Sequence, residues 1–238
     1  MKESSITSIV LSVLLAAVIL PAAVSAETIA MIGTGDVSSA LGPRFAALGH
    51  TIVYGSRDPS REKVSDLIAR TGHGASAMVP AEAATGADIV VLAVPGDVIE
   101  AVTKGLGDLA GKIIIDPTNA LRRGEDGLFE MAVESSNAEL VQGWAPDAFV
   151  VKAFNTLNWR QMADPKSAGG PVSIPLVGDS AEAKAVVASL VEGIGLEPID
   201  LGPVRYAHVL EGMLVLWVNS RFVNGQPFEF HLREVESK

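Results

Sequence analysis

The chain has 238 residues, of which 48% are hydrophobic and 19% charged, a composition typical of a globular protein and not of a disordered or fibrous one. Its formal net charge of −10 argues against nucleic acid and anionic membrane surfaces as partners, because both carry negative charge. The absence of cysteine excludes disulfides, thiolate metal sites and a catalytic thiol.

The first 26 residues have the pattern of an export signal. Residues 4–26 carry no charge, Pro21 interrupts their apolar run, and the segment closes on the small-residue motif Val-Ser-Ala that precedes a signal-peptide cleavage site. We expect cleavage after Ala26 and a mature periplasmic or secreted chain of residues 27–238. A retained membrane anchor is the alternative, but a spanning helix needs roughly 20 apolar residues and this run is shorter.

Strand and helix patterns alternate from residue 28 onward, which predicts a parallel sheet covered by helices. Strands are expected at residues 28–32, 51–54, 75–79, 89–94, 112–116, 149–154, 173–177 and 197–200. Helices are expected at residues 35–48, 59–70, 81–85, 98–106, 128–135, 138–144 and 181–192, with a last strong helix at 204–223 and loops at 122–127 and 164–170. The pattern predicts one α/β domain, a Rossmann-type, doubly wound, mostly parallel sheet with a C-terminal helical extension.

A glycine-rich loop follows the first strand directly. Gly33 permits a tight turn, Gly35 allows close approach of a pyrophosphate, and Ser38 stands at the position where a small residue keeps the helix near the sheet. Free amides and the dipole of the helix that begins here attract an anion. The motif, the strand before it and the helix after it together indicate a dinucleotide-binding site, whereas a glycine turn needed only for packing is the alternative.

The end of the second strand indicates NADP as the dinucleotide. An NAD-binding domain places an acidic residue here to bind the ribose diol, but this chain has Ser56 and Arg57, which can hold a 2′-phosphate. Arg61 adds a positive charge one turn further on. The alternative is an ordinary solvated loop with a surface arginine.

At these residues the sequence resembles the NADPH-dependent reductases of the deazaflavin coenzyme F420, and the related dinucleotide domain of the six-transmembrane metalloreductases. The resemblance covers nearly the whole mature chain. The matching segments are residues 33–37, 49–57, 88–95, 116–119, 151–156, 177–179 and 196–203.

The resemblance implies that NADP lies along the glycine loop and the end of the second strand, with its nicotinamide near the ends of the fourth and fifth strands. The implied cofactor-binding residues are Gly33, Thr34, Gly35, Asp36, Val37, Ser56, Arg57, Arg61, Val94, Pro95 and Thr118. The implied floor of the second-substrate site is Ala153, Phe154, Asn155 and Thr156, over which the last helix closes. Hydride would pass directly between two stacked rings, which requires positioning and no acid–base pair.

The remaining residue patterns give weaker indications of function. The four histidines share no metal-ligand spacing, so we expect no metal site. Glu211 lies on the apolar last helix, either in a polar stripe facing solvent or in contact with a pocket. That helix has more apolar residues than a single core-facing stripe needs, which predicts a homodimer built on it.

These observations predict an NADP-dependent oxidoreductase whose hydride acceptor is a small molecule with a flavin- or deazaflavin-like ring, coenzyme F420 and a flavin being the candidates, and whose further partner is a redox protein. An exported dinucleotide-binding sensor or partner subunit without turnover is the alternative. The alternative follows from the predicted export. Pyridine nucleotides are cytoplasmic and too charged to cross a membrane unaided, so an exported protein would lack its cofactor unless the cofactor is supplied.

Overall fold

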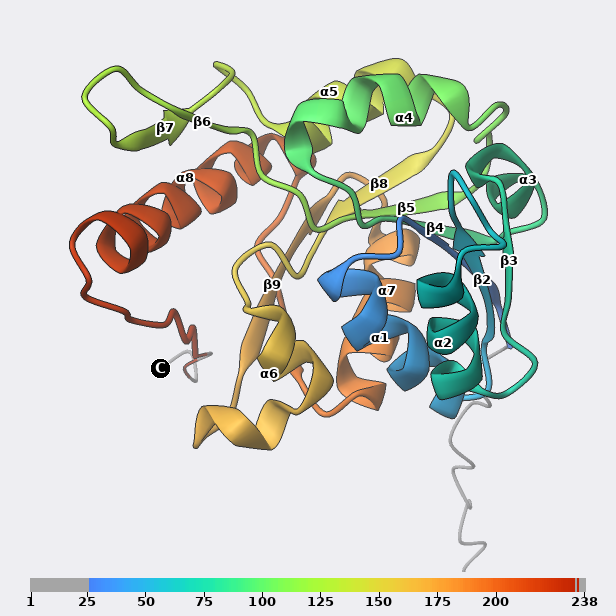
Figure 1. Ribbon diagram of the computed structural model, residues 1–238. Helices are drawn as coiled ribbons and strands as arrows, with labels where there is room; N and C mark the ends of the chain where they lie inside the picture. The colour runs from blue at the N-terminus through green and yellow to red at the C-terminus, as the bar shows by residue number, and fades with distance from the viewer. Residues whose placement is uncertain (1–25, 234, 236–238) are drawn as a thin grey trace, which may run out of the picture.

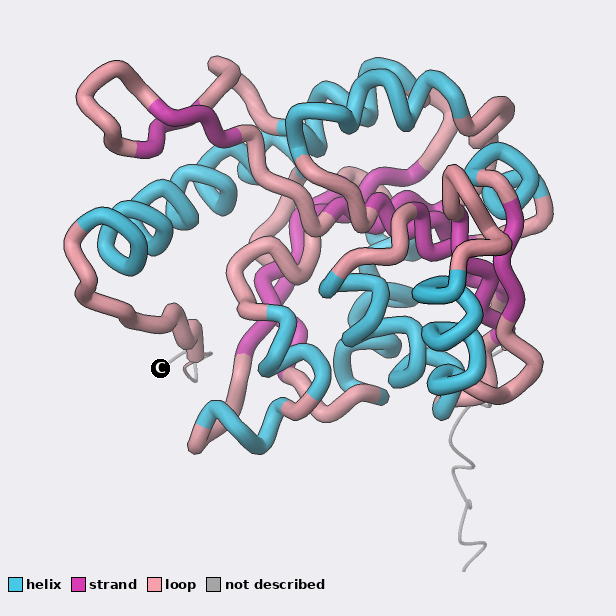
Figure 2. The backbone as a smooth tube through the Cα atoms, viewed as in Figure 1, coloured by secondary structure: helices cyan, strands magenta, loops and turns pink. Residues whose placement is uncertain are grey.

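The computed structural model describes residues 26–233 and 235, and its centre is an eight-stranded sheet with the order β10-β9-β8-β5-β4-β1-β2-β3 (Figures 1 and 2). All neighbouring strands are parallel except β8 and β9. The strands are β1 Thr28–Ile32, β2 Thr51–Gly55, β3 Ser76–Met78, β4 Ile89–Leu92, β5 Ile113–Asp116, β8 Phe149–Lys152, β9 Ser173–Gly178 and β10 Glu197–Asp200. The predicted fold class is confirmed.

Helices cover both faces of this sheet (Figure 1). One core cluster packs α1, α6 and α7 on one face, and a second packs α3, α4, α5 and α8 on the other. The helices are α1 Asp36–Ala47, α2 Glu62–Thr71, α3 Pro80–Thr85, α4 Ile99–Gly105, α5 Asn137–Trp144, α6 Trp159–Ala163, α7 Ala181–Gly193 and α8 Ala207–Val218. Short 3-10 turns lie at Gly96–Val98, Pro165–Ala168 and Val204–Tyr206.

The chain reverses direction through the sheet between β1 and β4. After β1 it moves outward through β2 and β3, and it then returns to β4 on the other side of β1. In open α/β sheets, ligands bind outside the carboxyl ends of the strands at such a switch point. The glycine loop follows β1, so the topology places it at this position.

The predicted helix at residues 128–135 is wrong. These residues contribute to a two-stranded antiparallel hairpin, β6 Leu121–Arg123 and β7 Phe129–Met131, which also replaces part of the predicted loop at 122–127. The side-chain amide of Asn219 holds the hairpin, because it accepts from the Phe129 amide and donates to the Phe129 carbonyl, both at 2.7 Å. Contacts from 90 residues further along the chain therefore override the local helical pattern.

The predicted last helix is interrupted. After the 3-10 turn at Val204–Tyr206, the α-helical part is α8, and a π-helical turn follows at Asn219–Val223. Val209, Leu216 and Phe222 of this region remain largely exposed, so the homodimer stays a prediction that this apolar surface supports. Within residues 26–233 and 235, no helix is long and apolar enough to cross a membrane.

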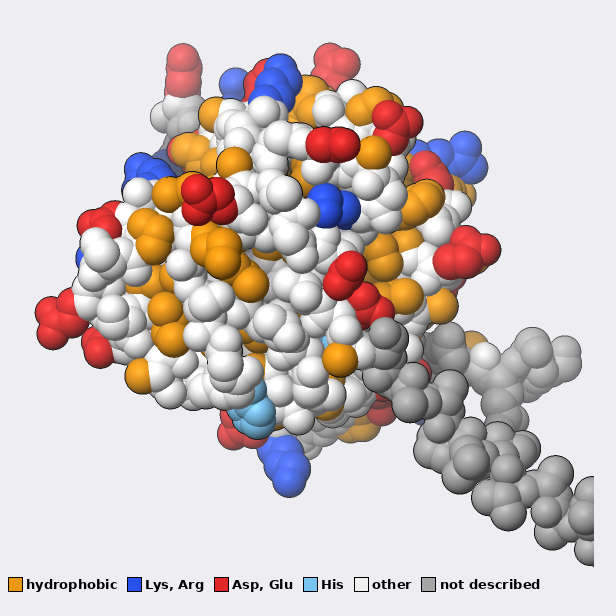
Figure 3. Space-filling view, turned by 90° about the vertical axis from the view of Figure 1, so that its right-hand side faces the viewer, with side chains coloured by type: hydrophobic (Ala, Val, Ile, Leu, Met, Phe, Trp, Pro, Cys, Tyr) orange, Lys and Arg blue, Asp and Glu red, His pale blue; other side chains and the backbone are white. Residues whose placement is uncertain are grey.

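Charge is mixed on the side of the molecule where α2 and α3 lie. Figure 3 shows acidic and basic side chains scattered there among hydrophobic ones. Met78, at the end of the edge strand β3, is among the exposed hydrophobic residues. The net charge of −10 therefore does not make this face uniformly acidic.

The described chain is anchored at its start by His50. The Glu27 amide donates to His50 Nδ1 at 3.1 Å, and the Glu27 carbonyl accepts from the Thr51 amide, so the chain is held directly before β1. Burial lowers the pKa of His50, although the nearby Glu27 carboxylate opposes this, and a neutral ring is the form that accepts. The predicted export signal lies outside the described residues, apart from Ala26.

Candidate functional site

The glycine loop is shaped for a close backbone approach. Gly33 has a φ of 107°, and a Cβ at this position would lie 2.3 Å from the Ala93 carbonyl oxygen, so no other residue fits. A Cβ at Gly35 would meet no atom within 4 Å, so this position is open to a ligand. Gly35 also precedes α1 without a capping side chain, which leaves the first helix amides available to an anion.

Side chains fix the shape of this loop. Ser38 is fully buried and donates from Oγ to the Gly33 carbonyl at 2.8 Å, which ties the first turn of α1 to the end of β1. Asp36 is exposed at the helix start, and Val37 packs against the core. Thr34 accepts from Arg61 Nη2 at 3.4 Å, so the structure brings Arg61 to the glycine loop.

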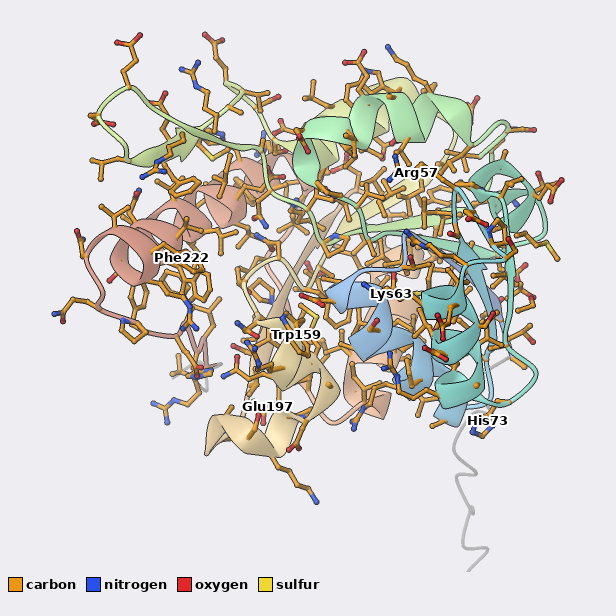
Figure 4. All side chains as sticks on the ribbon, in the orientation of Figure 1. Arg57, Lys63, His73, Trp159, Glu197 and Phe222 are labelled. Atoms are coloured by element: carbon orange, nitrogen blue, oxygen red, sulfur yellow. The ribbon has the colours of Figure 1, made fainter. Side chains whose placement is uncertain are left out.

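The segment after β2 lies beside this loop, since the Gly33 amide donates to the Gly55 carbonyl at 2.9 Å. Ser56 is buried, and its hydroxyl donates to the Asp58 carbonyl. Arg57 is exposed and lies on the loop that leaves β2 (Figure 4). The predicted start of the second helix at residue 59 is wrong, because Asp58 instead caps a turn through Ser60 and α2 begins at Glu62.

The loops after β4 and β5 meet on the other side of Gly33. Val94 lies against Gly33, and the next residue, Pro95, is exposed to solvent. A Cβ at Gly96 would lie 2.2 Å from the Asn119 carbonyl oxygen, so glycine is required where the two loops touch. Thr118 is buried there and accepts from Asn137 Nδ2 at 2.9 Å.

A buried charge cluster (Asp116, Lys152 and Glu211) underlies these loops. Lys152 Nζ lies 2.8 Å from Asp116 Oδ2 and 2.6 Å from Glu211 Oε1, and it also donates to the Thr118 carbonyl. All three charged side chains are 0% exposed. The solvent-facing interpretation of Glu211 is therefore wrong.

Glu211 also holds backbone from two other segments. Its carboxylate accepts from the Ala120 amide at 2.8 Å, the Asn137 amide at 3.2 Å and the Ala138 amide at 3.5 Å. It thus joins α8 to the loop after β5 and to the start of α5. Asp116 Oδ1 accepts from the Thr118 amide at 2.8 Å, which fixes the same loop from beneath.

The predicted substrate floor is divided between core and site. Ala153 and Phe154 are buried in the core, where the Phe154 ring packs against that of Phe45 with centroids 6.3 Å apart. Phe154 has a φ of 65°, unusual for a residue with a side chain. The strained turn carries the chain from β8 to Asn155 and Thr156, the two members of the predicted floor whose side chains are not part of this core cluster.

Asn155 has a buried acceptor without a partner. Its Nδ2 donates to the Leu210 carbonyl at 3.0 Å and to Asn119 Oδ1 at 3.1 Å, and the Leu210 carbonyl fixes which end of the amide is nitrogen. Asn155 Oδ1 has no hydrogen-bond partner among the described residues, although Asn155 is only 4% exposed. Because an unpaired buried acceptor is costly, this atom is a candidate acceptor for a donor supplied by a ligand or a water molecule.

Sequence reasoning missed Asp116, Asn119, Asn137 and Lys152. A usable signal existed for two of them, because Asp116 and Lys152 are charged residues at the carboxyl ends of otherwise apolar strands. Asn119 lies in the segment 116–119 that resembles the family, although the resemblance implies no role for it, and Asn137 lies in a segment without a signal of either kind. In the described part of the chain, no group of three or more His, Asp or Glu residues could hold a metal ion.

Comparison with known proteins supports this architecture. Residues 28–120 match the family "NADP oxidoreductase coenzyme F420-dependent". The crystal structure of a protein assigned as an F420-dependent NADP reductase, from Arthrobacter sp. FB24, has a TM-score of 0.79 and 33% identity, covering 87% of this chain and 100% of that one. The structural likeness therefore extends well beyond the residues that the family model matches.

Two groups of curated relatives match the chain. The F420-dependent NADP reductase of Methanothermobacter marburgensis is 28% identical over 209 residues, which covers 81% of this chain and 91% of the relative. Metalloreductase STEAP3 of Rattus norvegicus is 29% identical over 189 residues, or 79% of this chain. The chain spans about a third of the length of the metalloreductases, with 36% of the rat protein covered.

The fold and the glycine loop therefore define a Rossmann-type dinucleotide-dependent oxidoreductase. The chain belongs to the F420-dependent NADP oxidoreductase family. A more distant likeness, to a reductive aminase of Aspergillus terreus with a TM-score of 0.60 and 18% identity, reflects the fold alone.

Proposed function

We propose that this protein transfers hydride between NADP(H) and a planar flavin- or deazaflavin-like ring that lies against Asn155 and Thr156. When bound, the cofactor supplies or accepts the hydride at its nicotinamide ring, and an acceptor ring reduced by it takes up one proton from solvent. The protein contributes position alone: the glycine loop holds the pyrophosphate, and the loops that contain Val94 and Thr118 hold the nicotinamide.

The observation that carries this proposal is the unpaired Asn155 Oδ1. It lies where the loop after β8 meets Asn119 and α8, at the carboxyl edge of the sheet beside the proposed nicotinamide position. Flavin and deazaflavin rings have an N–H group on their pyrimidine edge that can donate to such an acceptor. The names of the reductases that resemble this chain are in keeping with an acceptor of this kind.

Asn155→Ala is expected to lower kcat/KM for a ring acceptor roughly five- to tenfold, the value of one neutral hydrogen bond. The measurement is the acceptor-dependent loss of NADPH absorbance, with FMN, riboflavin and coenzyme F420 as acceptors. Asn224→Ala, on an exposed asparagine beyond the C-terminal helical region, is the matched control and should behave as wild type.

The nicotinamide carboxamide is the other N–H donor that could reach Asn155. A weaker affinity for NADPH in Asn155→Ala, with no change in the KM of the acceptor, would assign the contact to the cofactor and contradict the proposed ring site. Mass spectrometry of small molecules retained by the purified protein tests the alternative of a binding module. Retained NADP with no turnover of any ring acceptor would favour that alternative.

We also propose that the mature protein begins at Glu27 and acts outside the cytoplasm. Cleavage after Ala26 would leave β1 intact, and a free α-amino group at Glu27 could still donate to His50 Nδ1. Intact-mass analysis of protein from its native host is expected to show loss of residues 1–26. Recovery of soluble full-length protein from the cytoplasm would contradict export.

A further inference from the structure

A cavity of about 410 Å³ lies next to the proposed ring site, between α6 and the C-terminal segment. Its volume is within the range of about 300–1,000 Å³ that is usual for small-ligand sites. Trp159 on α6 and Phe222 after α8 mark the two parts of the chain that border it (Figure 4). Its lining includes Thr156, Arg160, Trp217, Arg221, Phe228 and Phe230.

Two arginines give this cavity a positive character that is unusual in a chain of net charge −10. Arg160 lies over the Trp159 ring at 4.6 Å, and Arg221 lies over the Trp217 ring at 5.4 Å, which limits where their guanidinium groups can go. Neither makes an ion pair with an acidic side chain in residues 26–233. Both are therefore available to an anion.

One carboxylate shares the cavity. Glu229 accepts from Gln161 Nε2, and its other oxygen lies 3.2 Å from His231 Nε2. These contacts tie Glu229 to α6 and to the C-terminal segment and leave it unpaired with either arginine. The Leu232 amide donates to Ser173 Oγ at 2.8 Å, which fastens this segment to the first residue of β9.

The cavity and the ring site share α8 and the segment after β8. Thr156 lines the cavity and directly follows Asn155, while Leu210 binds the Asn155 amide and Trp217 lines the cavity. Leu210 and Trp217 are about two helical turns apart, or roughly 10 Å along α8. This spacing along α8 sets a length scale of roughly 10 Å for the side chain of a molecule that extends from the ring site to the arginines.

We propose that this cavity binds the anionic side chain, a phosphate or carboxylate, of the same acceptor whose ring lies at Asn155. The inference rests on the proposed function and makes it more specific, because it restricts the acceptors to rings with an acidic side chain of about 10 Å. Arg160 and Arg221 pair with the anion, and the aromatic residues pack against the chain that links it to the ring.

Riboflavin and FMN test this proposal, because they share the ring and the linking chain and differ by one phosphate. In NADPH-dependent reduction by the intact protein, FMN is expected to have a KM about tenfold below that of riboflavin. Arg160→Gln combined with Arg221→Gln should remove this difference by raising the KM for FMN alone. Arg205→Gln, whose guanidinium lies over Tyr206 outside the cavity, should leave both values unchanged.

Equal KM values for the two flavins in the wild-type protein would overturn the inference and leave the proposed function intact. An equal rise for both flavins in the double variant would also overturn it. If neither flavin nor coenzyme F420 is reduced, the proposed function fails, and equilibrium binding followed by flavin fluorescence decides the inference separately. Tighter binding of FMN in the wild type but not in the double variant supports it, and equal binding refutes it.

Discussion

Lys152→Met is expected to lower the free energy of unfolding by about 3–5 kcal/mol. The substitution removes the cation that separates Asp116 from Glu211 and leaves two carboxylates in a region with 0% exposure. It also removes the donor to the Thr118 carbonyl. Breaking a buried ion pair in this way is costly because the remaining charges stay desolvated and repel one another.

Urea denaturation of the two proteins at neutral pH measures the difference. Lys104→Met is the matched control, since Lys104 also pairs with a carboxylate at 2.6 Å, that of Glu100, but the two side chains are 55% and 60% exposed. Exposed pairs of this kind contribute about 0.3–0.5 kcal/mol. A loss for Lys152→Met as small as that of the control would show that the buried charge cluster does not hold α8 against the sheet.

Adding Glu211→Gln to Lys152→Met identifies the source of the effect. The glutamine side chain would keep an oxygen for the amides of Ala120 and Asn137 while removing one of the two stranded negative charges. The double variant should then be more stable than the sum of the two single effects predicts, because residues in direct contact are not additive. Strict additivity would point to lost packing and not to stranded charge.

The strands of the sheet could be predicted because each strand carries its own signal. Residues 89–92 form a run of apolar residues and residues 113–115 another, and such runs between helical patterns indicate buried parallel strands. The sequence signal of the glycine loop is equally local, since Gly33 and Gly35 lie within one turn. Physical constraints confined to a few neighbouring residues are visible in a single sequence.

The hairpin at β6 and β7 and the buried charge cluster could not be predicted, because both depend on distant partners. Phe129 is held by Asn219, and Lys152 is paired with Glu211, which lies 59 residues further along the chain. A sequence shows that Glu211 is an acid on an apolar helix but not that a buried lysine faces it. The same limit applies to the cavity, which forms only when the C-terminal segment returns to α6.

NADP is expected to bind at least about tenfold more tightly than NAD, and this preference is expected to depend on Arg57. No carboxylate occupies the diol-binding position after β2, where Ser56 and Arg57 stand. Arg61, the second basic residue that the sequence indicates, reaches Thr34 of the glycine loop in the structure and so provides another cation near the same place. A hydrogen bond to a charged partner contributes about 1.5–3 kcal/mol, or roughly 10- to 150-fold in affinity.

Solvent acts against this pairing, since Arg57 and Arg61 are both exposed. The lower end of the range is therefore the appropriate expectation for either arginine alone. The net charge of −10 also opposes a nucleotide at long range, but salt screens that repulsion beyond about 10 Å. Local pairing at the 2′-phosphate should consequently decide between the two nucleotides.

Arg57→Ala is expected to remove most of the NADP preference and to leave NAD binding nearly unchanged, because NAD lacks the phosphate that Arg57 would hold. Calorimetry of the wild-type protein and the variant with both nucleotides measures this. Arg70→Ala, an exposed arginine in the last turn of α2, is the matched control and should keep the wild-type preference. Equal affinities of the wild-type protein for NADP and NAD would mean that residues 55–57 form only a surface loop, and cofactor choice would then have to reside in Arg61 or elsewhere along the glycine loop.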